Sequence, residues 1–143
     1  MPDLIPAPFA TLLKRLRYEP GRQQTMFDLP LSEMYRGSAG LNLGVHFHGL
    51  AAGTPLGPAA GPHDQLAQNI VLAWLGGSRI VELKTVQVLD ELTVNRPCID
   101  ATTVGFNIEW SQELKLHESL REYVKASMII DILQAENALG IPD

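Results

Sequence analysis

The sequence predicts an α/β fold: the opening part of a (β/α)8 TIM-type barrel, incomplete in this chain and preceded by an N-terminal helical arm. A short apolar run at 55–60 ends in Ala-Ala-Gly. A helix-like segment follows at 63–76, and a second short run at 79–85 has Lys84 near its end. Successive parallel strands of a barrel bring such a loop and such a charged group to the same rim.

The chain length limits this barrel to its first units. The protein has 143 residues, whereas a complete (β/α)8 barrel takes about 250. We therefore expect residues 1–40 to form the helical arm and residues 41–143 to form a partial barrel. The chain is then either a fragment or a subunit that other chains complete.

The arm is predicted from apolar spacing and from proline. Residues 9–17 have the spacing of an amphipathic helix, and Pro8 suits its first turn. Pro20 and Gly21 are expected to stop this helix. The residues at helical spacing are Phe9, Leu12, Leu13 and Leu16.

Two strands are expected next. Leu41–Phe47 alternates apolar residues with small or polar ones, which is typical of a half-buried strand. Gly49–Gly53 is expected to turn the chain, so that 55–60 pairs with the first strand as a hairpin at the closed end of the barrel.

A helix, a strand and a strand end follow. We expect a helix over His63–Gly76 that ends at Gly76-Gly77, then a strand over Arg79–Thr85. Gly105–Ile108 is expected to end a third strand. The apolar stripe of the helix consists of Leu66, Ile70, Ala73 and Trp74.

The last predicted element is a long helix. Ser111 is an acceptable N-cap, and the helix should run to about residue 138, where Gly140 and Pro142 close it. Its buried face is expected to contain Leu116, Leu120, Tyr123, Ser127, Ile130 and Leu133.

Composition excludes several classes of protein. Eleven basic and sixteen acidic residues give a net charge of −5, and their interspersed distribution argues against nucleic acid or an anionic membrane as the main partner. The sequence has no transmembrane-length apolar run and no signal-peptide core, so we expect a cytoplasmic protein. The single cysteine, Cys98, forms no internal disulfide; a buried thiol is favoured over a thiol activated by Arg96.

Several residues could bind a ligand, and each has a simpler structural reading. Glu82 and Lys84 share one face of the predicted strand, which is a solvated face in an open sheet but looks inward in a barrel. From spacing alone the solvated face is favoured. The turn at 59–61 would let a planar ligand approach the backbone, although a plain tight turn is favoured. Asn107, within an apolar run, is equally suited to read a ring edge or to bridge strands.

Metal binding has weaker support. His46 and His48 could both face one side of a strand, but further ligands at a telling spacing are missing, so two surface imidazoles are favoured. We expect no resident metal.

Four blocks of sequence resemble a known group of enzymes. They are 55–63 with 65–70, 82–87, 96–100 and 106–111, and the likeness covers about residues 5 to 138. They are similar to the FMN-binding barrel of dihydroorotate and dihydropyrimidine dehydrogenases. The nearest likeness is to the N-terminal part of the selenate reductase subunit family of large bacterial flavo-iron–sulfur oxidoreductases.

The resemblance implies an FMN on the carboxyl rim of the barrel. It implies that Ala59, Ala60 and Gly61 contact the flavin through their backbone, and that Lys84 stabilises the reduced anionic ring from its N1/C2 side. Thr85 would hydrogen-bond nearby, and Asn107 would face the ring or the substrate.

The implied chemistry is hydride or electron transfer, but no catalytic residue is assigned. In the family, later segments supply the acid–base residue and the phosphate site, so activity of this chain alone is not expected. Downstream flavo-iron–sulfur domains or further copies of the chain are the expected partners. The alternative function is a non-catalytic interaction domain, or an inactive truncated product, that docks on partner chains through a strand edge and an apolar helix stripe.

Overall fold

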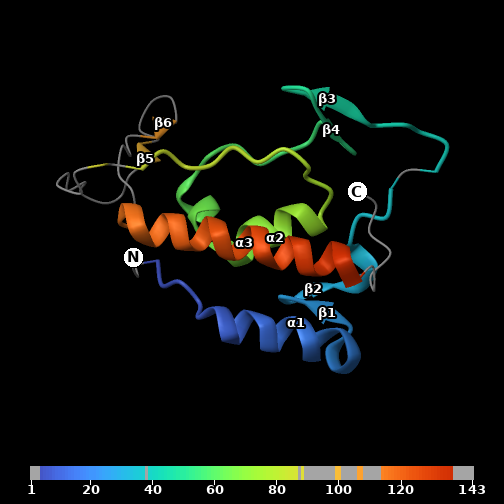
Figure 1. Ribbon diagram of the computed structural model, residues 1–143, viewed down its shortest axis with the longest axis horizontal. Helices are drawn as coiled ribbons and strands as arrows, with labels where there is room; N and C mark the ends of the chain where they lie inside the picture. Colours follow the sequence, from blue (N-terminus) through green and yellow to red (C-terminus); the bar gives the residue numbers. More distant parts are fainter. Residues whose placement is uncertain are drawn as a thin grey trace.

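The computed structural model describes residues 4–37, 39–86, 88, 99–100, 106–107 and 114–136. Its main elements are three helices, of which α3 is the longest and packs against α2, while α1 lies along the other side of the molecule (Figure 1). In the described part of the chain, no helix is both long and apolar enough to cross a membrane. The helices are α1 (Phe9–Gln23), α2 (Ala67–Leu75) and α3 (Leu116–Glu136), with short 3-10 turns η1 (Leu31–Glu33) and η2 (Pro62–Gln65).

The described strands form three separate antiparallel pairs and no closed barrel. They are β1 (Thr25–Met26) with β2 (Leu29–Pro30), β3 (Val45–Phe47) with β4 (Leu50–Ala52), and β5 (Ile99–Asp100) with β6 (Phe106–Asn107). The strand end expected at 105–108 is therefore a strand at β6, although its partner is antiparallel.

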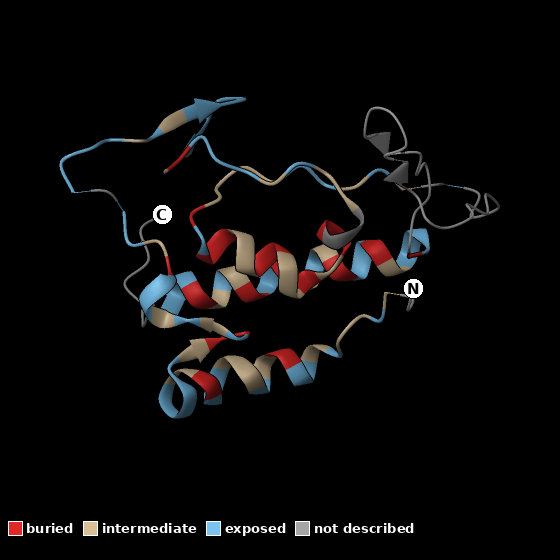
Figure 2. Ribbon diagram, turned by 180° about the vertical axis from the view of Figure 1, so that it is seen from behind, coloured by how far each residue is buried: buried red, intermediate tan, exposed pale blue. Residues whose placement is uncertain are grey.

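One hydrophobic core joins the N-terminal segment to the two later helices. Figure 2 shows buried residues on all three helices. Because α1, β1 and the turn after it contribute to the same core as α2 and α3, burial of apolar surface ties these elements together. The buried members of this core are Leu12, Met26, Phe27, Met34, Ala67, Ile70, Val71, Trp74, Leu75, Ala126, Ile129 and Leu133.

Helix α1 is longer than predicted. The expected stop at Pro20-Gly21 is wrong, since the helix continues to Gln23. A proline near the end of a helix removes only one late hydrogen bond. Gln24 then adopts a left-handed conformation, and its side-chain amide donates a hydrogen bond of 2.7 Å to the Pro20 carbonyl, which caps the last turn.

The predicted hairpin exists, but its second strand is misplaced. Strand β3 begins at Val45 instead of Leu41, and it pairs with 50–52, within the expected turn. The actual turn is His48-Gly49, where both residues have positive φ. The strand predicted at 55–60 is wrong, because those residues belong to no strand.

Helix α2 begins later than expected. The predicted start at His63 is taken by η2, and α2 begins at Ala67. Its predicted end at Gly76-Gly77 is confirmed. Gly77 has φ +107°, and a Cβ there would meet the Tyr35 ring at 2.9 Å, so both backbone geometry and packing require glycine.

Helix α3 is rotated relative to the prediction. Leu116, Leu120 and Ser127 were expected in the core but are exposed, whereas Tyr123 and Ile130 are half-buried and Leu133 is buried. The start at Ser111 and the closing residues 140 and 142 lie outside the described residues. The apolar pattern misled because two polar residues, Ser119 and Glu122, face the core.

Glu122 explains this rotation. Its carboxylate accepts a hydrogen bond of 2.9 Å from the backbone N–H of Ala67, the first residue of α2, and pairs with Lys125 one turn later on α3. Lys125 also donates to the Ala7 carbonyl at 2.8 Å. A carboxylate at a helix N-terminus accepts a hydrogen bond from an otherwise unpaired N–H group and interacts favourably with the positive end of the helix dipole. The pair of Glu122 and Lys125 therefore fixes α2, α3 and the N-terminal segment together.

Replacing Glu122 by alanine is expected to lower the free energy of unfolding by about 3 kcal/mol, because it removes a helix cap and leaves the largely buried Lys125 ammonium without its partner. Urea unfolding followed by circular dichroism measures this loss. Glu136→Ala, at the exposed end of α3, is the matched control and should change the free energy by less than about 0.5 kcal/mol. Equal losses in the two variants would contradict this role of Glu122.

Candidate cofactor-binding site

Two extended segments, 54–61 and 77–86, lie side by side with α2 as the connection between them (Figure 1). The Thr54 hydroxyl donates a hydrogen bond of 2.6 Å to the Gly77 carbonyl. Farther along, the N–H groups of Arg79 and Ile80 both donate to the Leu56 carbonyl, at 3.0 and 3.2 Å. Partners advance together along both segments, so the segments run in the same direction, as in a β–α–β unit.

Gly57 allows this close approach. A Cβ at this position would lie 1.7 Å from the Ile80 carbonyl oxygen and 2.8 Å from its carbon. Both neighbours are backbone atoms and cannot rotate away. The segments therefore pack backbone against backbone at a point where every residue but glycine would push them apart.

The small-residue bend closes the first segment. Ala59 is exposed, while Ala60 and Gly61 are half-buried. The Gly61 carbonyl accepts a hydrogen bond of 3.0 Å from the Asp64 N–H, which starts η2. The Ala60 N–H donates to the exposed Glu82 carboxylate at 3.1 Å. The bend therefore presents a backbone donor on the side of the second segment.

The second segment departs from the expected strand. The prediction of a strand over 79–85 is wrong, because the structure has no ladder there. Val81 packs on the core, but Leu83 is 48% exposed and Lys84 is half-buried, so the expected alternation is incomplete. The side chain that contacts the bend is that of Glu82. Thr85 is exposed beyond it.

Tyr123 holds the end of this segment against α3. Its hydroxyl donates a hydrogen bond of 3.2 Å to the Lys84 carbonyl. Burial raises the pKa of Tyr123 above its usual value of 10, and the negative charge of Asp64 raises it further. The neutral phenol, which is the form that donates the bond, is therefore favoured in the folded protein.

The structure leaves the predicted role of Asn107 untested and places the two histidines in the β3–β4 hairpin. Asn107 lies in β6 opposite Ile99, but its side chain and Cys98 fall outside the described residues. His46 and His48 are exposed at the β3–β4 hairpin, where the His48 ring packs edge-on against Phe47. The residues that the structure describes contain no cluster of three or more side chains suited to hold a metal ion.

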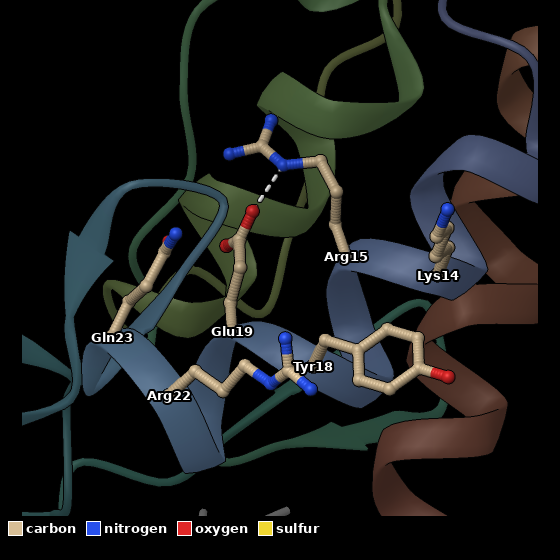
Figure 3. A pocket seen from close by; sticks show the side chains of 6 residues that line it. All are labelled: Lys14, Arg15, Tyr18, Glu19, Arg22 and Gln23. Atoms are coloured by element: carbon tan, nitrogen blue, oxygen red, sulfur yellow. Dashed lines mark hydrogen bonds and ion pairs between the residues drawn. The ribbon is translucent and has the colours of Figure 1, made fainter.

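A separate hollow of about 510 Å³ lies along α1 (Figure 3). Within it, Arg15 pairs with Glu19 and donates to Asp28 at 2.7 Å. Burial opposes the charge of Arg15, but these two carboxylates outweigh it and raise the pKa of Arg15. The predicted ligand residues take no part in this hollow, and the interspersed-charge argument overlooked its basic lining. The lining residues are Lys14, Arg15, Tyr18, Glu19, Arg22 and Gln23.

Sequence reasoning also missed the buried polar residues beside the two segments. Gln65 is fully buried and accepts a hydrogen bond of 3.0 Å from the Leu114 N–H. Glu122 and Ser119 on α3 are also buried. The one available signal was Glu122 three residues before Lys125, a spacing that pairs charges on a helix.

Comparisons with known proteins agree on one family. The model of a family described as "Oxidoreductase YgfK, N-terminal TIM-barrel domain" matches residues 27–143. Two curated relatives, both named "Putative oxidoreductase YgfK" and from Escherichia coli strains K12 and O157:H7, are each 47% identical over 130 residues. The alignment covers 91% of this chain but 12% of each relative, so the chain spans about an eighth of their length. No solved structure matches the chain.

Gly57→Ala should lower the free energy of unfolding by about 2 kcal/mol, because the added methyl group collides with the Ile80 backbone. Gly21→Ala is the matched control: it lies within α1, its Cβ meets nothing within 4 Å, and alanine favours the helix, so stability should rise by up to about 1 kcal/mol. Urea unfolding measures both. An unchanged free energy of unfolding in Gly57→Ala would show that the two segments are not in close backbone contact.

Tyr123→Phe should cost about 1 kcal/mol at neutral pH through the lost bond to Lys84. Because the folded pKa is raised, the stabilising contribution of Tyr123 is present below about pH 10 and is lost as the pH rises through the raised value. The stability difference between wild type and variant should therefore shrink above pH 10. Denaturant unfolding across this range checks it, with the exposed Tyr18→Phe as control. A stability difference between wild type and Tyr123→Phe that stays constant across this pH range would contradict the raised pKa of Tyr123.

Proposed function

Because this chain belongs to the family of the oxidoreductase YgfK N-terminal TIM-barrel domain, we propose that it supplies the first β/α units of an FMN-binding barrel in an oxidoreductase. The proposed chemistry is hydride or electron transfer of the dihydroorotate and dihydropyrimidine dehydrogenase kind, within the selenate reductase subunit family. A cytoplasmic location belongs to the same proposal.

The observation that carries the proposal is the same-direction pairing of 54–61 and 77–86 around α2. In an α/β barrel, ligands bind where such strands end and their loops begin. Here the first segment ends in the bend at Ala59–Gly61, and the second ends near Lys84. In a barrel, such a unit would deliver a small-residue turn and a cation toward one rim.

The residues present fit part of an FMN site. A planar ring needs close backbone approach and a hydrogen-bond donor at its edge, and the bend offers small side chains and the Ala60 N–H. That N–H is bonded to an exposed carboxylate, Glu82, which a ligand acceptor could replace. The proposal assigns the phosphate site to later segments of the longer protein, so this chain would hold part of the pocket.

FMN, when bound, supplies an acceptor for a hydride or for single electrons. The bend at Ala59, Ala60 and Gly61 would orient the ring through its backbone. Lys84 would place an ammonium beside the N1/C2 edge, where negative charge develops on reduction, and a fixed cation there favours the reduced state. Thr85 would add a hydrogen bond, and Asn107 would face the ring or the substrate. The activity itself belongs to the longer protein.

A second candidate function is a non-catalytic interaction domain. It is favoured by the row of exposed apolar side chains on α3, because such a row on a surface helix marks a contact with another surface. The two candidates are compatible, since a barrel segment can both hold a cofactor and dock.

Flavin binding tests the proposal. FMN titrated into the purified chain should give a saturable change in flavin fluorescence. Lys84→Ala should weaken the binding of reduced FMN about tenfold more than that of oxidised FMN, which corresponds to a two-electron reduction potential about 30 mV lower. Lys14→Ala, which removes an exposed cation from α1, is the matched control and should bind like wild type.

Two outcomes would contradict the proposal. Absence of any saturable change with wild type would remove the FMN site from this chain. Equal potentials for bound FMN in wild type and Lys84→Ala would remove the role of Lys84.

A further inference from the structure

The carboxylate of Glu82 occupies a backbone donor of the candidate site. It accepts a hydrogen bond of 3.1 Å from the N–H of Ala60, the middle residue of the bend at Ala59–Gly61. Glu82 is exposed and Ala60 is half-buried, so the bond lies where a ligand could reach it. A backbone N–H has one hydrogen to donate. A ligand acceptor at the bend must therefore compete with Glu82 for it.

Other contacts hold the two extended segments together without Glu82. The Thr54 hydroxyl donates to the Gly77 carbonyl at 2.6 Å, and the Leu56 carbonyl accepts hydrogen bonds from two N–H groups of the second segment. The Tyr123 hydroxyl holds the far end of that segment against α3 with a hydrogen bond of 3.2 Å. Figure 1 shows the two segments side by side, with α2 as their connection. The side chain of Glu82 can therefore leave the bend without separating the segments.

The carboxylate of Glu82 has little else to hold it in place. Among the residues that the structure describes, no salt bridge joins Glu82 to a cation, and Lys84 on the same segment is not its partner. The side chain can rotate about several single bonds, and a released carboxylate regains its hydration in water. A hydrogen bond exposed to solvent contributes little net free energy, because water can replace either partner. Such a bond forms in the free protein and yields readily to a well-placed ligand acceptor.

We propose that Glu82 is an internal competitor of the cofactor: it holds the Ala60 N–H in the free protein and is displaced when an acceptor on the ring edge of FMN takes that bond. This inference rests on the proposed function, since it needs a ring at the bend. A ligand that displaces Glu82 but offers no acceptor leaves the N–H unpaired and loses affinity. Glu82 therefore selects for rings that carry a carbonyl oxygen or ring nitrogen at this edge.

Titration of oxidised FMN into Glu82 variants of the purified chain, followed by flavin fluorescence, tests the competition. Glu82→Ala removes the competitor and should lower the FMN dissociation constant about fivefold, the ratio expected from one net hydrogen bond. Glu82→Gln keeps an acceptor oxygen at the same place and should stay within about twofold of wild type. Glu136→Ala removes an exposed carboxylate from the last residue of α3, and as the matched control it should bind like wild type.

Lumiflavin, which has the flavin ring without the phosphate, separates displacement from charge repulsion. Because the competition lies at the ring edge, Glu82→Ala should bind lumiflavin about fivefold more tightly than wild type as well. Hydrogen exchange of the Ala60 amide, measured by NMR, follows the bond directly. Without flavin this amide should exchange faster in Glu82→Ala than in wild type, and saturating FMN should slow its exchange in the variant.

Several outcomes would overturn the competitor role and leave the FMN site intact. They are weaker or unchanged FMN binding by Glu82→Ala while wild type saturates, binding by Glu82→Gln as tight as by Glu82→Ala, and a gain with FMN that vanishes with lumiflavin. The last two would assign the effect to the charge of Glu82 instead of to its occupation of the Ala60 N–H. Absence of saturation in wild type and in every Glu82 variant would overturn the proposed function, and this inference with it.

Discussion

The carboxylate of Glu122 is the contact on which most of the arrangement depends. It reaches from the middle of α3 to the first N–H of α2 and pairs with Lys125, which in turn holds the Ala7 carbonyl. A buried charge is tolerated only where partners compensate for its lost hydration, so this geometry leaves α3 little freedom to rotate. The same constraint decides which residues of α3 enter the core and which remain on the surface.

A second constraint acts on the backbone. Gly57 meets the Ile80 carbonyl so closely that the two extended segments have one possible spacing, and α2 connects them. Tyr123 then joins the far end of the second segment to α3. The bend at Ala59–Gly61 and the segment around Lys84 are thus positioned by groups outside the candidate site itself, as preorganised sites generally require.

The sequence located the three helices but not the end of α1, the start of α2 or the buried face of α3, and it predicted the strands poorly. Glycine pairs and apolar spacing located the end of α2, since these signals act within one turn. The pairing partner of β3 was predicted wrongly because a short hairpin has several nearly equivalent registers. In the structure the turn lies at His48-Gly49, where both residues have the positive φ that a two-residue hairpin turn requires. Of the candidate site, the bend and the neighbouring segment were anticipated, whereas the contact through Glu82 was not, because alternation in a strand assumes a ladder that the structure does not form there.

The misassigned face of α3 has a physical reason that bears on function. Helix α3 buries Ser119 and Glu122, whereas four of its large apolar residues form an exposed row. Exposing four large apolar side chains in water is unfavourable for an isolated domain, since each loses part of the free energy that burial would give. The polar contact that organises the interior and the apolar row on the surface are therefore two consequences of the same helix orientation. Such a row is suited to contact with another surface, and the aligned part of this chain covers only 12% of each curated relative.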